Sequence, residues 1–448
     1  MRDFTKGNIL KSLILFSLPI IIGDILQGIY TIVDAVWVGR LIGYEALAAV
    51  SASTPLIFFL LSLIIGINAS TNILVAQSFG AKNNDLLSKV LTNSFLTVGV
   101  SCVFISCISI IFARNLLKII NTPVSIMEDA YIYLIIILGG LILQAAYYWF
   151  SVVLRGLGNS KTPLILLCMS VVLNIVITPL LIVGVGPLPE LGIAGSALGT
   201  VISTLITTVI GYIYLIRKNQ FLDIANWHLK FDKQIIKKIF SLGIPISFQM
   251  FIKSLSALLL VALVNTFGPA VIATYGIGIR LDMFAFMPAL SIGIAVSSMV
   301  AQNLGARRIE RVPTILKWAL LFSLCIAGIV FAFLNIFSHR IAALFTQNPE
   351  VVVNTIRYIS IVSFGYILFA IMFSFHGVIR GAGDIKIQLL FTFISLIVFR
   401  IPFAYFLANH TMLKEAGIWI AIPAGVFVAT VLNLVYYLSG RWKHKMLL

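Results

Sequence analysis

The sequence predicts an all-α integral membrane protein with twelve transmembrane helices arranged as two six-helix bundles. Of its 448 residues, 60% are hydrophobic and only 10% are charged, whereas soluble domains carry about 25% charged residues. The mean hydropathy is +1.09. Two further observations support this fold class: the chain contains twelve long apolar stretches, and its second half repeats motifs of its first half.

Each predicted span meets the length that a bilayer requires, about 20 mostly apolar residues. Charged or Gly/Pro/Asn-rich breaks separate the spans. The expected spans are residues 12–38, 46–76, 90–112, 130–154, 162–184, 193–216, 239–266, 271–301, 313–337, 351–379, 387–408 and 417–440.

The positive charge is distributed asymmetrically between the connecting segments. With the amino terminus in the cytoplasm, 22 of the 31 Lys and Arg residues fall on the inner side and six on the outer side. Cytoplasmic loops carry such an excess, so the sequence predicts a multi-pass protein of the cell membrane with both termini cytoplasmic. The net charge of +16 therefore reflects orientation in a lipid bilayer, and we expect no nucleic-acid partner.

Motifs recur at a separation of 225 residues. VLRGLGNSKTP at 153–163 matches VIRGAGDIKIQ at 378–388, and VAQSFGAK at 75–82 matches VAQNLGAR at 300–307. Six spans return the chain to its starting side, so the two bundles are expected to share one orientation and to be related by a pseudo-twofold axis along the membrane normal. The predicted division is an amino-terminal lobe at 1–216, a cytoplasmic linker at 217–238 and a carboxyl-terminal lobe at 239–448.

The glycine motif resembles a phosphate loop only superficially. A phosphate loop needs a preceding strand and a helix that opens with Gly-Lys-Ser/Thr, and neither is present, so we interpret the motif as a tight basic turn between spans. The four cysteines lie in apolar spans without metal-ligand spacing. The five histidines are scattered, and no His-Glu-x-x-His or Gly-x-Ser-x-Gly motif occurs. We therefore expect no cofactor, no metal site and no enzyme.

The motifs and their positions resemble the multidrug and toxic compound extrusion (MATE) family along essentially the whole chain. The residues that carry this resemblance are FSLPIIIGDILQGIYTIVDAVWVGRLIG in the first span together with the two motif pairs above. The resemblance implies a V-shaped central cavity between two six-helix lobes. It also implies export of cationic or amphiphilic compounds driven by inward flow of H+ or Na+. The first-span aspartate is most similar to the DNA-damage-inducible and archaeal branch.

Asp34 is the main candidate for ion coupling. An ionisable group within a span is a functional candidate by default, and Gln27, Tyr30 and Asp34 share one helix face at positions i, i+3 and i+7. Asp34 lies six residues before Arg40, about 9 Å of helix rise, which places it in the outer half of the membrane. We interpret it as a proton switch. The alternative is a carboxylate that a neighbouring cation holds permanently ionised.

Other polar residues recur at helical spacing on apolar spans and would complete a substrate cavity with Gln27 and Tyr30. Such residues also serve as hydrogen-bonding contacts between membrane helices, so only convergence on one lobe favours a binding role. The substrate-binding candidates are Asn68, Asn72, Tyr133, Gln144 and Thr200, with Tyr147, Ser196, Ser203 and Thr207 on the same stripes.

The fifth span departs from the family pattern. That pattern has an Asn followed four residues later by an Asp, and here the pair is Asn174 and Thr178. The resemblance therefore supports Asp34 and Asn174 as coupling residues, with Thr178 in the position of the missing acid, and it weakens any scheme that uses two acids or a carboxylate-rich Na+ site. Asp24, nearer the midplane, could substitute for the missing acid or form an ion pair.

The carboxyl-terminal lobe carries cations near mid-span, namely Lys253, Arg280 and Arg400, with Asp282 as its in-span acid. Buried cations need partners, so we expect these residues to face the protein interior. The norfloxacin-resistance branch places acids in the seventh and tenth spans. This sequence has neither, so that site is not carried over. His376 is expected to be a core histidine with a satisfied hydrogen bond.

The leading hypothesis is a monomeric secondary antiporter that exchanges H+, in preference to Na+, for a small cationic or amphiphilic compound through Asp34. The alternative is a lipid-linked oligosaccharide flippase, in which Lys253, Arg280 and Arg400 would receive a diphosphate.

Overall fold

The computed structural model describes residues 1–186, 189–218 and 231–444, and the described secondary structure is entirely helical. Eleven helices in this part of the chain are long and apolar enough to cross a membrane, and a bent helix pair brings the number to twelve. The prediction of an all-helical membrane protein is confirmed. Large apolar side chains such as Phe58, Phe104, Val172 and Leu258 are exposed on the spans, as expected where lipid and not water surrounds the helices.

The chain forms two compact units. The amino-terminal unit comprises Met1–Arg2 and Ile22–Ser247, and the carboxyl-terminal unit comprises Asp3–Ile21 and Phe248–Leu448. Two long helices contribute to both units: α1 (Ile9–Leu41) and α9 (Lys233–Val264). Most of the predicted linker, residues 219–230, lies outside the described residues.

The division of α1 and α9 follows their prolines. α1 contains Pro19 and changes unit after Ile21, and α9 contains Pro245 and changes unit after Ser247. A proline inside a helix removes one backbone hydrogen bond and allows the helix to kink. The two helices therefore share the same construction at equivalent positions of the two halves.

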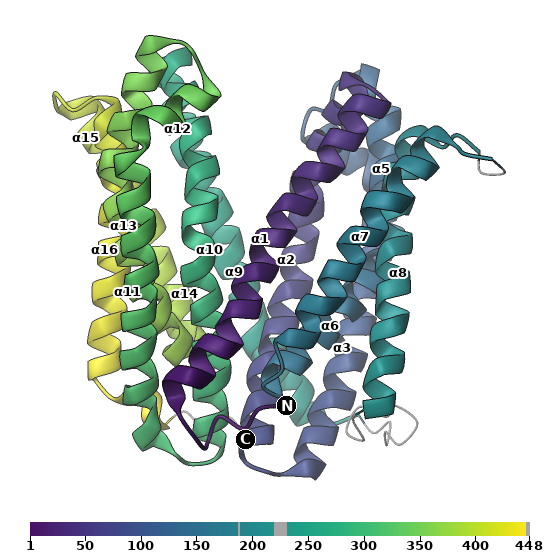
Figure 1. Ribbon diagram of the computed structural model, residues 1–448, viewed down its shortest axis with the longest axis vertical. Helices are drawn as coiled ribbons and strands as arrows, with labels where there is room; N and C mark the ends of the chain where they lie inside the picture. The colour runs from purple at the N-terminus through teal and green to yellow at the C-terminus, as the bar shows by residue number, and fades with distance from the viewer. Residues whose placement is uncertain (187–188, 219–230, 445–448) are drawn as a thin grey trace. The chain divides into compact units, whose positions relative to one another are not determined.

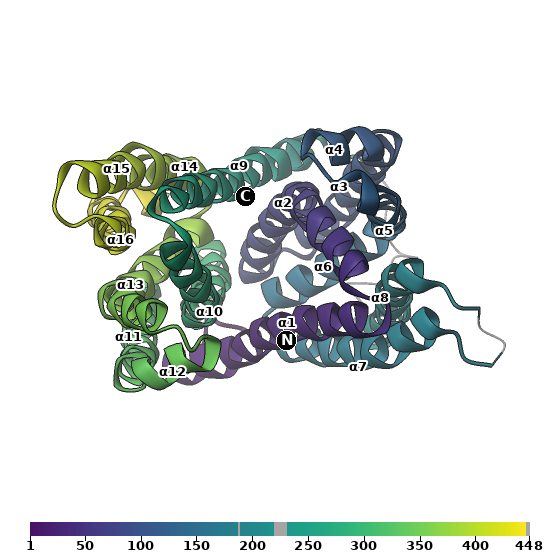
Figure 2. The same ribbon diagram turned by 90° about the horizontal axis from the view of Figure 1, so that it is seen from above.

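The amino-terminal unit packs its helices around a core that includes Ala49, Leu117, Leu134 and Leu138. In this unit α8 packs against α5, α6 and α7 (Figures 1 and 2). Its further elements are α2 (Tyr44–Gly80), α3 (Asn84–Ile111), α4 (Ala113–Ile119), η1 (Val124–Ile126), α5 (Met127–Gly139), α6 (Leu141–Gly156), α7 (Lys161–Val183) and α8 (Gly192–Lys218).

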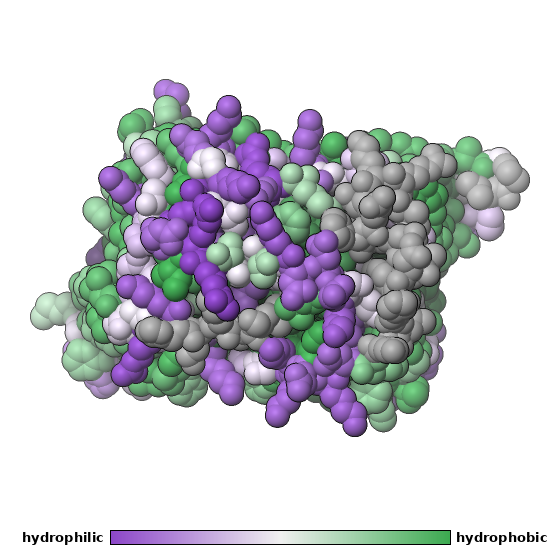
Figure 3. Space-filling view, turned by 90° about the horizontal axis from the view of Figure 1, so that it is seen from below, coloured by the Kyte–Doolittle hydropathy of each residue, from purple (hydrophilic) through white to green (hydrophobic). Residues whose placement is uncertain are grey.

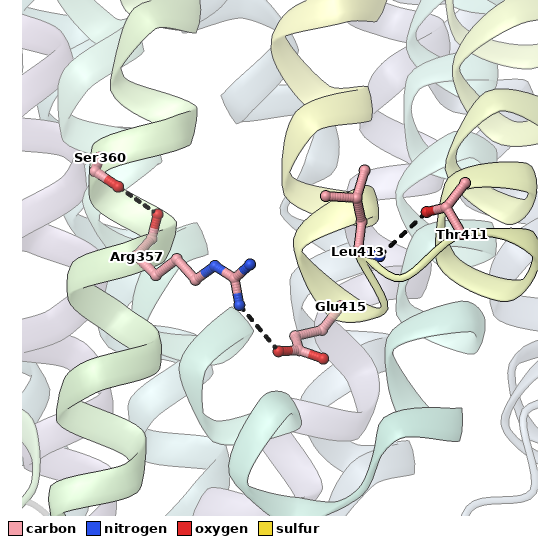
Figure 4. A network of polar contacts seen from close by, with 5 residues as sticks. All are labelled: Arg357, Ser360, Thr411, Leu413 and Glu415. Atoms are coloured by element: carbon pink, nitrogen blue, oxygen red, sulfur yellow. Dashed lines mark hydrogen bonds and ion pairs between the residues drawn. The ribbon is translucent and has the colours of Figure 1, made fainter.

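The carboxyl-terminal unit is centred on α13, which packs against α10, α11 and α16. An ion pair between Arg357 of α13 and Glu415 of α16, 3.6 Å between Nη1 and Oε1, also connects two of these helices (Figure 4). The elements of this unit are η4 (Asn265–Phe267), α10 (Pro269–Gly305), η5 (Ile309–Arg311), α11 (Val312–Ile336), α12 (Ser338–Phe345), α13 (Pro349–Ala382), α14 (Ile385–Phe393), the π-helix η6 (Ile394–Arg400), α15 (Ile401–His410), α16 (Glu415–Leu438) and η7 (Arg441–His444).

Two predicted spans are irregular. The span expected at 130–154 bends by 46° between Val124–Gly139 and Leu141–Gly156. Two consecutive glycines weaken the helix there, and a side chain at Gly140 would lie 2.4 Å from Val201 of α8. The span expected at 387–408 contains the π-helix η6 just before Pro402, where proline cannot continue the regular hydrogen-bond ladder.

The sequence repeat has a counterpart in the backbone. Lys82 and Arg307, which end the paired VAQ motifs, both have a left-handed φ, +54° and +58°. Gly158 and Gly383, in the paired glycine motifs, have φ of +79° and +84°. Each pair is 225 residues apart. Left-handed backbone favours glycine, so the second glycine of each motif forms a turn.

The first glycine of each motif allows close helix packing. A Cβ atom at Gly156 would lie 2.9 Å from Val75 Cγ1, and one at Gly381 would lie 2.6 Å from the carbonyl oxygen of Ser297. Both neighbours belong to the helix that carries the VAQ motif of the same unit. The glycine motif therefore has a packing and turn function in both units.

The VAQNLGAR motif, together with Arg308 directly after it, also holds the segment that precedes α1. The Phe4 amide donates to Gln302 Oε1 at 3.0 Å, Asn303 Nδ2 donates to the Phe4 carbonyl at 3.2 Å, and Arg308 donates to the Thr5 carbonyl at 2.8 Å.

Hydrophilic side chains gather over the helix ends seen in Figure 3, with hydrophobic side chains around them. This is the distribution expected where membrane helices end in water.

Candidate functional site

A polar, aromatic-lined pocket lies within the amino-terminal unit. It is formed by α1, α6, α7 and α8, and its unfilled space of about 450 Å³ includes open solvent. Four predicted residues, Gln27, Tyr30, Gln144 and Thr200, meet there. The remaining lining residues are Tyr147, Tyr148, Leu167, Ser170, Val171 and Thr204.

The break in the fourth span positions one wall of this pocket. α6 begins at Leu141 directly after Gly140, which packs against Val201 of α8. Gln144 lies one turn into α6, and its backbone N–H donates to the Gly140 carbonyl at 3.3 Å. Because Val201 adjoins Thr200, this contact brings the polar faces of α6 and α8 together.

A short hydrogen-bond chain joins three helices at the pocket. The Tyr30 hydroxyl lies 3.1 Å from Thr200 Oγ1, and Asn174 Nδ2 donates to the same oxygen at 3.2 Å. The residues come from α1, α8 and α7. A buried polar group is costly unless it is hydrogen-bonded, so this chain fixes the side of the pocket that adjoins Asn174.

Asp34 lies one turn beyond Tyr30 on α1. Its side chain is half-buried, and its Oδ1 is buried without a hydrogen-bond partner among the described residues. Tyr30 and Tyr133 lie close enough for their hydroxyls to interact electrostatically with Asp34. The ion pairs in the described part of the chain do not include it. The arrangement can take up a proton or attract a cation, since no cation among the described residues forms an ion pair with this carboxylate.

Asn174 and Thr178, the pair in the fifth span, lie in two different environments. Asn174 points its amide nitrogen to Thr200, while its Oδ1 has no partner among the described residues. Thr178 is fully buried, and a Cβ atom at Gly199 of α8 would lie 2.3 Å from its Oγ1. Thr178 therefore sits at the tight contact between α7 and α8.

The other predicted residues of this unit lie away from the pocket wall. Asn68 and Asn72 are buried in α2, and Asn72 Nδ2 donates to the Val152 carbonyl of α6 at 2.8 Å, a contact between helices. Tyr133 is buried near Asp34. Asp24 is half-buried and its charge acts on Tyr148.

The polar residues of the carboxyl-terminal unit form separate groups. Asp282 is buried and accepts a hydrogen bond from the hydroxyl of Tyr358 and another from that of Tyr366, each 2.7 Å long. Arg400 donates to Ser256 Oγ of α9. Arg280 is exposed on α10. The mid-span cations therefore do not all pair with Asp282.

The family comparison is decisive. The model of the family described as MatE matches residues 19–180 and 245–406. These two segments cover most of the chain and start at the two helix prolines. The chain belongs to the MATE family.

Relatives match this MATE transporter along almost its full length. The probable multidrug resistance proteins YoeA and YpnP of Bacillus subtilis (strain 168) are each 32% identical over 444 residues, 98% of this chain and 96% and 97% of theirs. The crystal structure of MATE in the bent conformation has a TM-score of 0.91 at 24% identity, covering 98% of this chain and 96% of that one. The predicted MATE fold is confirmed, and the protein is a transporter and not an enzyme.

Sequence reasoning did not single out several residues of the MATE pocket. Ser170 lies four residues before Asn174 and Thr204 four residues after Thr200, so helical spacing could have identified both. Tyr148 lies four residues after Gln144, so the same spacing could have identified it. The partners of Asp282, Tyr358 and Tyr366, lie 76 and 84 residues away, and only the tertiary structure brings them together.

Proposed function

We propose that this protein is a secondary active multidrug efflux antiporter that exports cationic or amphiphilic compounds in exchange for H+, with Asp34 as the coupling acid. The observation that carries this proposal is the position of Asp34. It lies one turn from the pocket residue Tyr30, and its Oδ1 has no hydrogen-bond partner among the described residues.

The pocket suits an organic cation. Tyr30, Tyr147 and Tyr148 offer aromatic rings, on which cations bind favourably, while Gln27, Gln144 and Thr200 offer neutral polar atoms. The names of YoeA and YpnP as probable multidrug resistance proteins agree with such substrates.

Coupling would follow from competition for one negative charge. The ionised carboxylate of Asp34 attracts a cationic substrate, and a proton on the carboxylate removes that attraction. A ligand shifts a conformational equilibrium only by its differential affinity for the two states. With both termini of the protein in the cytoplasm, substrate would enter from the cytoplasm or from the inner leaflet. Protonation of Asp34 would then rearrange the outer part of the amino-terminal lobe and release the substrate outward.

The donor set favours H+ over Na+. Asp34 supplies a carboxylate near Asn174 and Thr178, which supply only neutral oxygens. The other acid of α1, Asp24, acts on Tyr148 on another side of the pocket. Proton exchange needs one acid, while a hard metal cation prefers several oxygen ligands, carboxylates among them. Na+ coupling is the weaker alternative for this reason.

The flippase alternative would require Lys253, Arg280 and Arg400 to receive one diphosphate. Arg400 donates a hydrogen bond to Ser256, and Arg280 is exposed on α10. These contacts give the three cations no shared ligand position, so we propose the antiporter.

A proteoliposome experiment tests the proposal. Efflux of the lipophilic cation ethidium is measured under a pH gradient alone and under a Na+ gradient alone. We expect efflux under the pH gradient and none above background under the Na+ gradient. Efflux that needs the Na+ gradient would reject H+ coupling, and translocation of lipid-linked sugar without ethidium efflux would favour the flippase.

A further inference from the structure

Three basic side chains gather where α9 faces the end of α13 in the carboxyl-terminal unit. His376 and Arg380 are four residues apart on α13 and share a face with Phe373, three residues before His376. Lys253 Nζ lies 6.0 Å from the centre of the Phe373 ring. The rings of Phe373 and His376 are 5.8 Å apart and edge-on. Lys253 therefore lies over the face of α13 that carries His376 and Arg380.

The positive charges of this group lie close enough to act on one another. The positive charge of Arg380 acts on Lys253, and both act on the His376 ring. Among the described residues, the ion pairs are Arg114–Glu128 and Arg357–Glu415, so neither Lys253 nor Arg380 has a carboxylate within ion-pair distance.

The nearby acids are engaged elsewhere. Asp384, four residues after Arg380, accepts a hydrogen bond from Tyr436, and Asp282 accepts two from tyrosines. The carboxyl end of a helix favours a cation within its last turn, and Arg380 is in the last turn of α13. Lys253 is in the interior of α9 and gains nothing from that effect. Within the described part of the chain, Lys253 and Arg380 therefore keep their positive charge without a paired carboxylate.

Two amides hold the surrounding backbone in place. Gln249 Nε2 of α9 donates to the Ile385 carbonyl at 3.4 Å, and Gln388 Nε2 of α14 donates to the His376 carbonyl at 2.6 Å. They connect α9, α13 and α14 around the basic group. Lys253 is exposed, and His376 and Arg380 are half-buried, so a ligand can reach all three.

We propose that Lys253, His376 and Arg380 form a binding site for the anionic head group, a phosphate or carboxylate, of an amphiphilic molecule. A guanidinium binds such groups through two parallel hydrogen bonds, and a lysine ammonium acts as a point charge. Phe373 packs beside the head group on its apolar side. The site goes beyond the proposed cation export, since it selects the opposite charge in the other unit.

Equilibrium binding without any ion gradient tests this site. The full-length protein is placed in phosphatidylcholine nanodiscs and titrated with radiolabelled dodecyl phosphate, with empty nanodiscs as background. Inorganic phosphate and phosphatidic acid are then added as competitors. Displacement by inorganic phosphate identifies a site for a free anion, and displacement by phosphatidic acid alone identifies a lipid head group. Failure of both to displace the probe would show that only the alkyl chain binds, which rejects the proposal.

Variants assign the binding to these residues. We expect Lys253→Gln and Arg380→Gln each to weaken dodecyl phosphate binding at least tenfold, and Lys253→Arg to stay within threefold of the unsubstituted protein. Lys317→Gln, which removes an exposed cation from α11, is the matched control and should change nothing. Unchanged affinity in Lys253→Gln would overturn the proposal.

Two controls separate a loss of binding from a loss of folding. If Arg380→Gln fails to fold, the pair Lys253→Gln and Lys253→Arg decides the question, because Lys253→Arg keeps the positive charge that Lys253→Gln removes. The melting temperature of each variant serves as the folding control. Since no gradient is applied, failure of Asp34 coupling would leave this binding result unaffected, and the two proposals can fail separately.

Discussion

The hydroxyl of Tyr30 on α1 lies 3.1 Å from that of Thr200 on α8, within the wall of the polar pocket. Asn174 donates to the same Thr200 oxygen. One threonine thus connects the helix that carries Asp34 with the fifth and sixth spans. A change in the position of α1 next to Tyr30 must break or move this contact.

Thr200→Val tests whether this contact supports transport. The substitution preserves shape but leaves the Tyr30 hydroxyl and the Asn174 amide without their partner, at a cost of about 1–3 kcal/mol for an unsatisfied buried group. We expect a several-fold lower rate of ethidium efflux. Because Tyr30 acts through Thr200, the double variant with Tyr30→Phe should lose less than the sum of the two single losses.

Thr207→Val is the control for this cycle. Thr207 is buried on the same helix, and its hydroxyl donates to the Ser203 carbonyl, away from the pocket lining. Its substitution should leave efflux close to normal. Strict additivity of the Tyr30 and Thr200 effects, or an equal loss in Thr207→Val, would argue against a shared network.

The two tyrosines at Asp282 should stabilise the carboxyl-terminal unit. Each hydroxyl donates a 2.7 Å hydrogen bond to the buried carboxyl, and hydrogen bonds to charged groups contribute about 1.5–3 kcal/mol. We expect Tyr358→Phe and Tyr366→Phe each to lower the melting temperature of the detergent-solubilised protein. Tyr405→Phe, which changes an exposed tyrosine, should not. A melting temperature that is unchanged in both buried variants would show that these bonds contribute nothing.

The first glycine of the repeated motif should tolerate no side chain. In Gly381→Ala the new methyl would lie 2.6 Å from the Ser297 carbonyl oxygen, and overpacking of this kind costs about 1–3 kcal/mol. We expect lower thermal stability. Gly328→Ala on α11 meets nothing within 4 Å and provides the comparison. Equal stability of the two variants would mean that α10 and α13 move apart without cost.

Composition and repeats predicted much of the fold, because lipid leaves few alternatives for apolar segments of span length. The 225-residue repeat predicted equivalent turns, which appear as matched left-handed residues at Lys82 and Arg307. The bend after Gly139 and the π-helix before Pro402 were not predicted. Gly139, Gly140 and Pro402 permit such irregularities, but the length and apolar content of a span do not reveal which irregularity will occur.

Periodicity predicted part of the candidate site. The face shared by Gln27 and Tyr30 reaches the pocket because helical spacing determines which residues lie together. It could not determine that Asn72 bonds to the Val152 carbonyl, 80 residues away. It also could not bring Lys253 next to His376, since these residues are on different helices. Spacing identifies a face, and tertiary packing decides what the face meets.

Ethidium efflux by Asp34→Asn in proteoliposomes, driven by a pH gradient alone, tests the central claim most directly. Asparagine keeps the size and polarity of the side chain but cannot exchange a proton. We expect normal folding, weaker ethidium binding because the negative charge is lost, and efflux at background. We also expect partial recovery in Asp34→Glu, which restores an acid. Efflux by Asp34→Asn at the rate of the unsubstituted protein would contradict the assignment of Asp34 as the coupling acid.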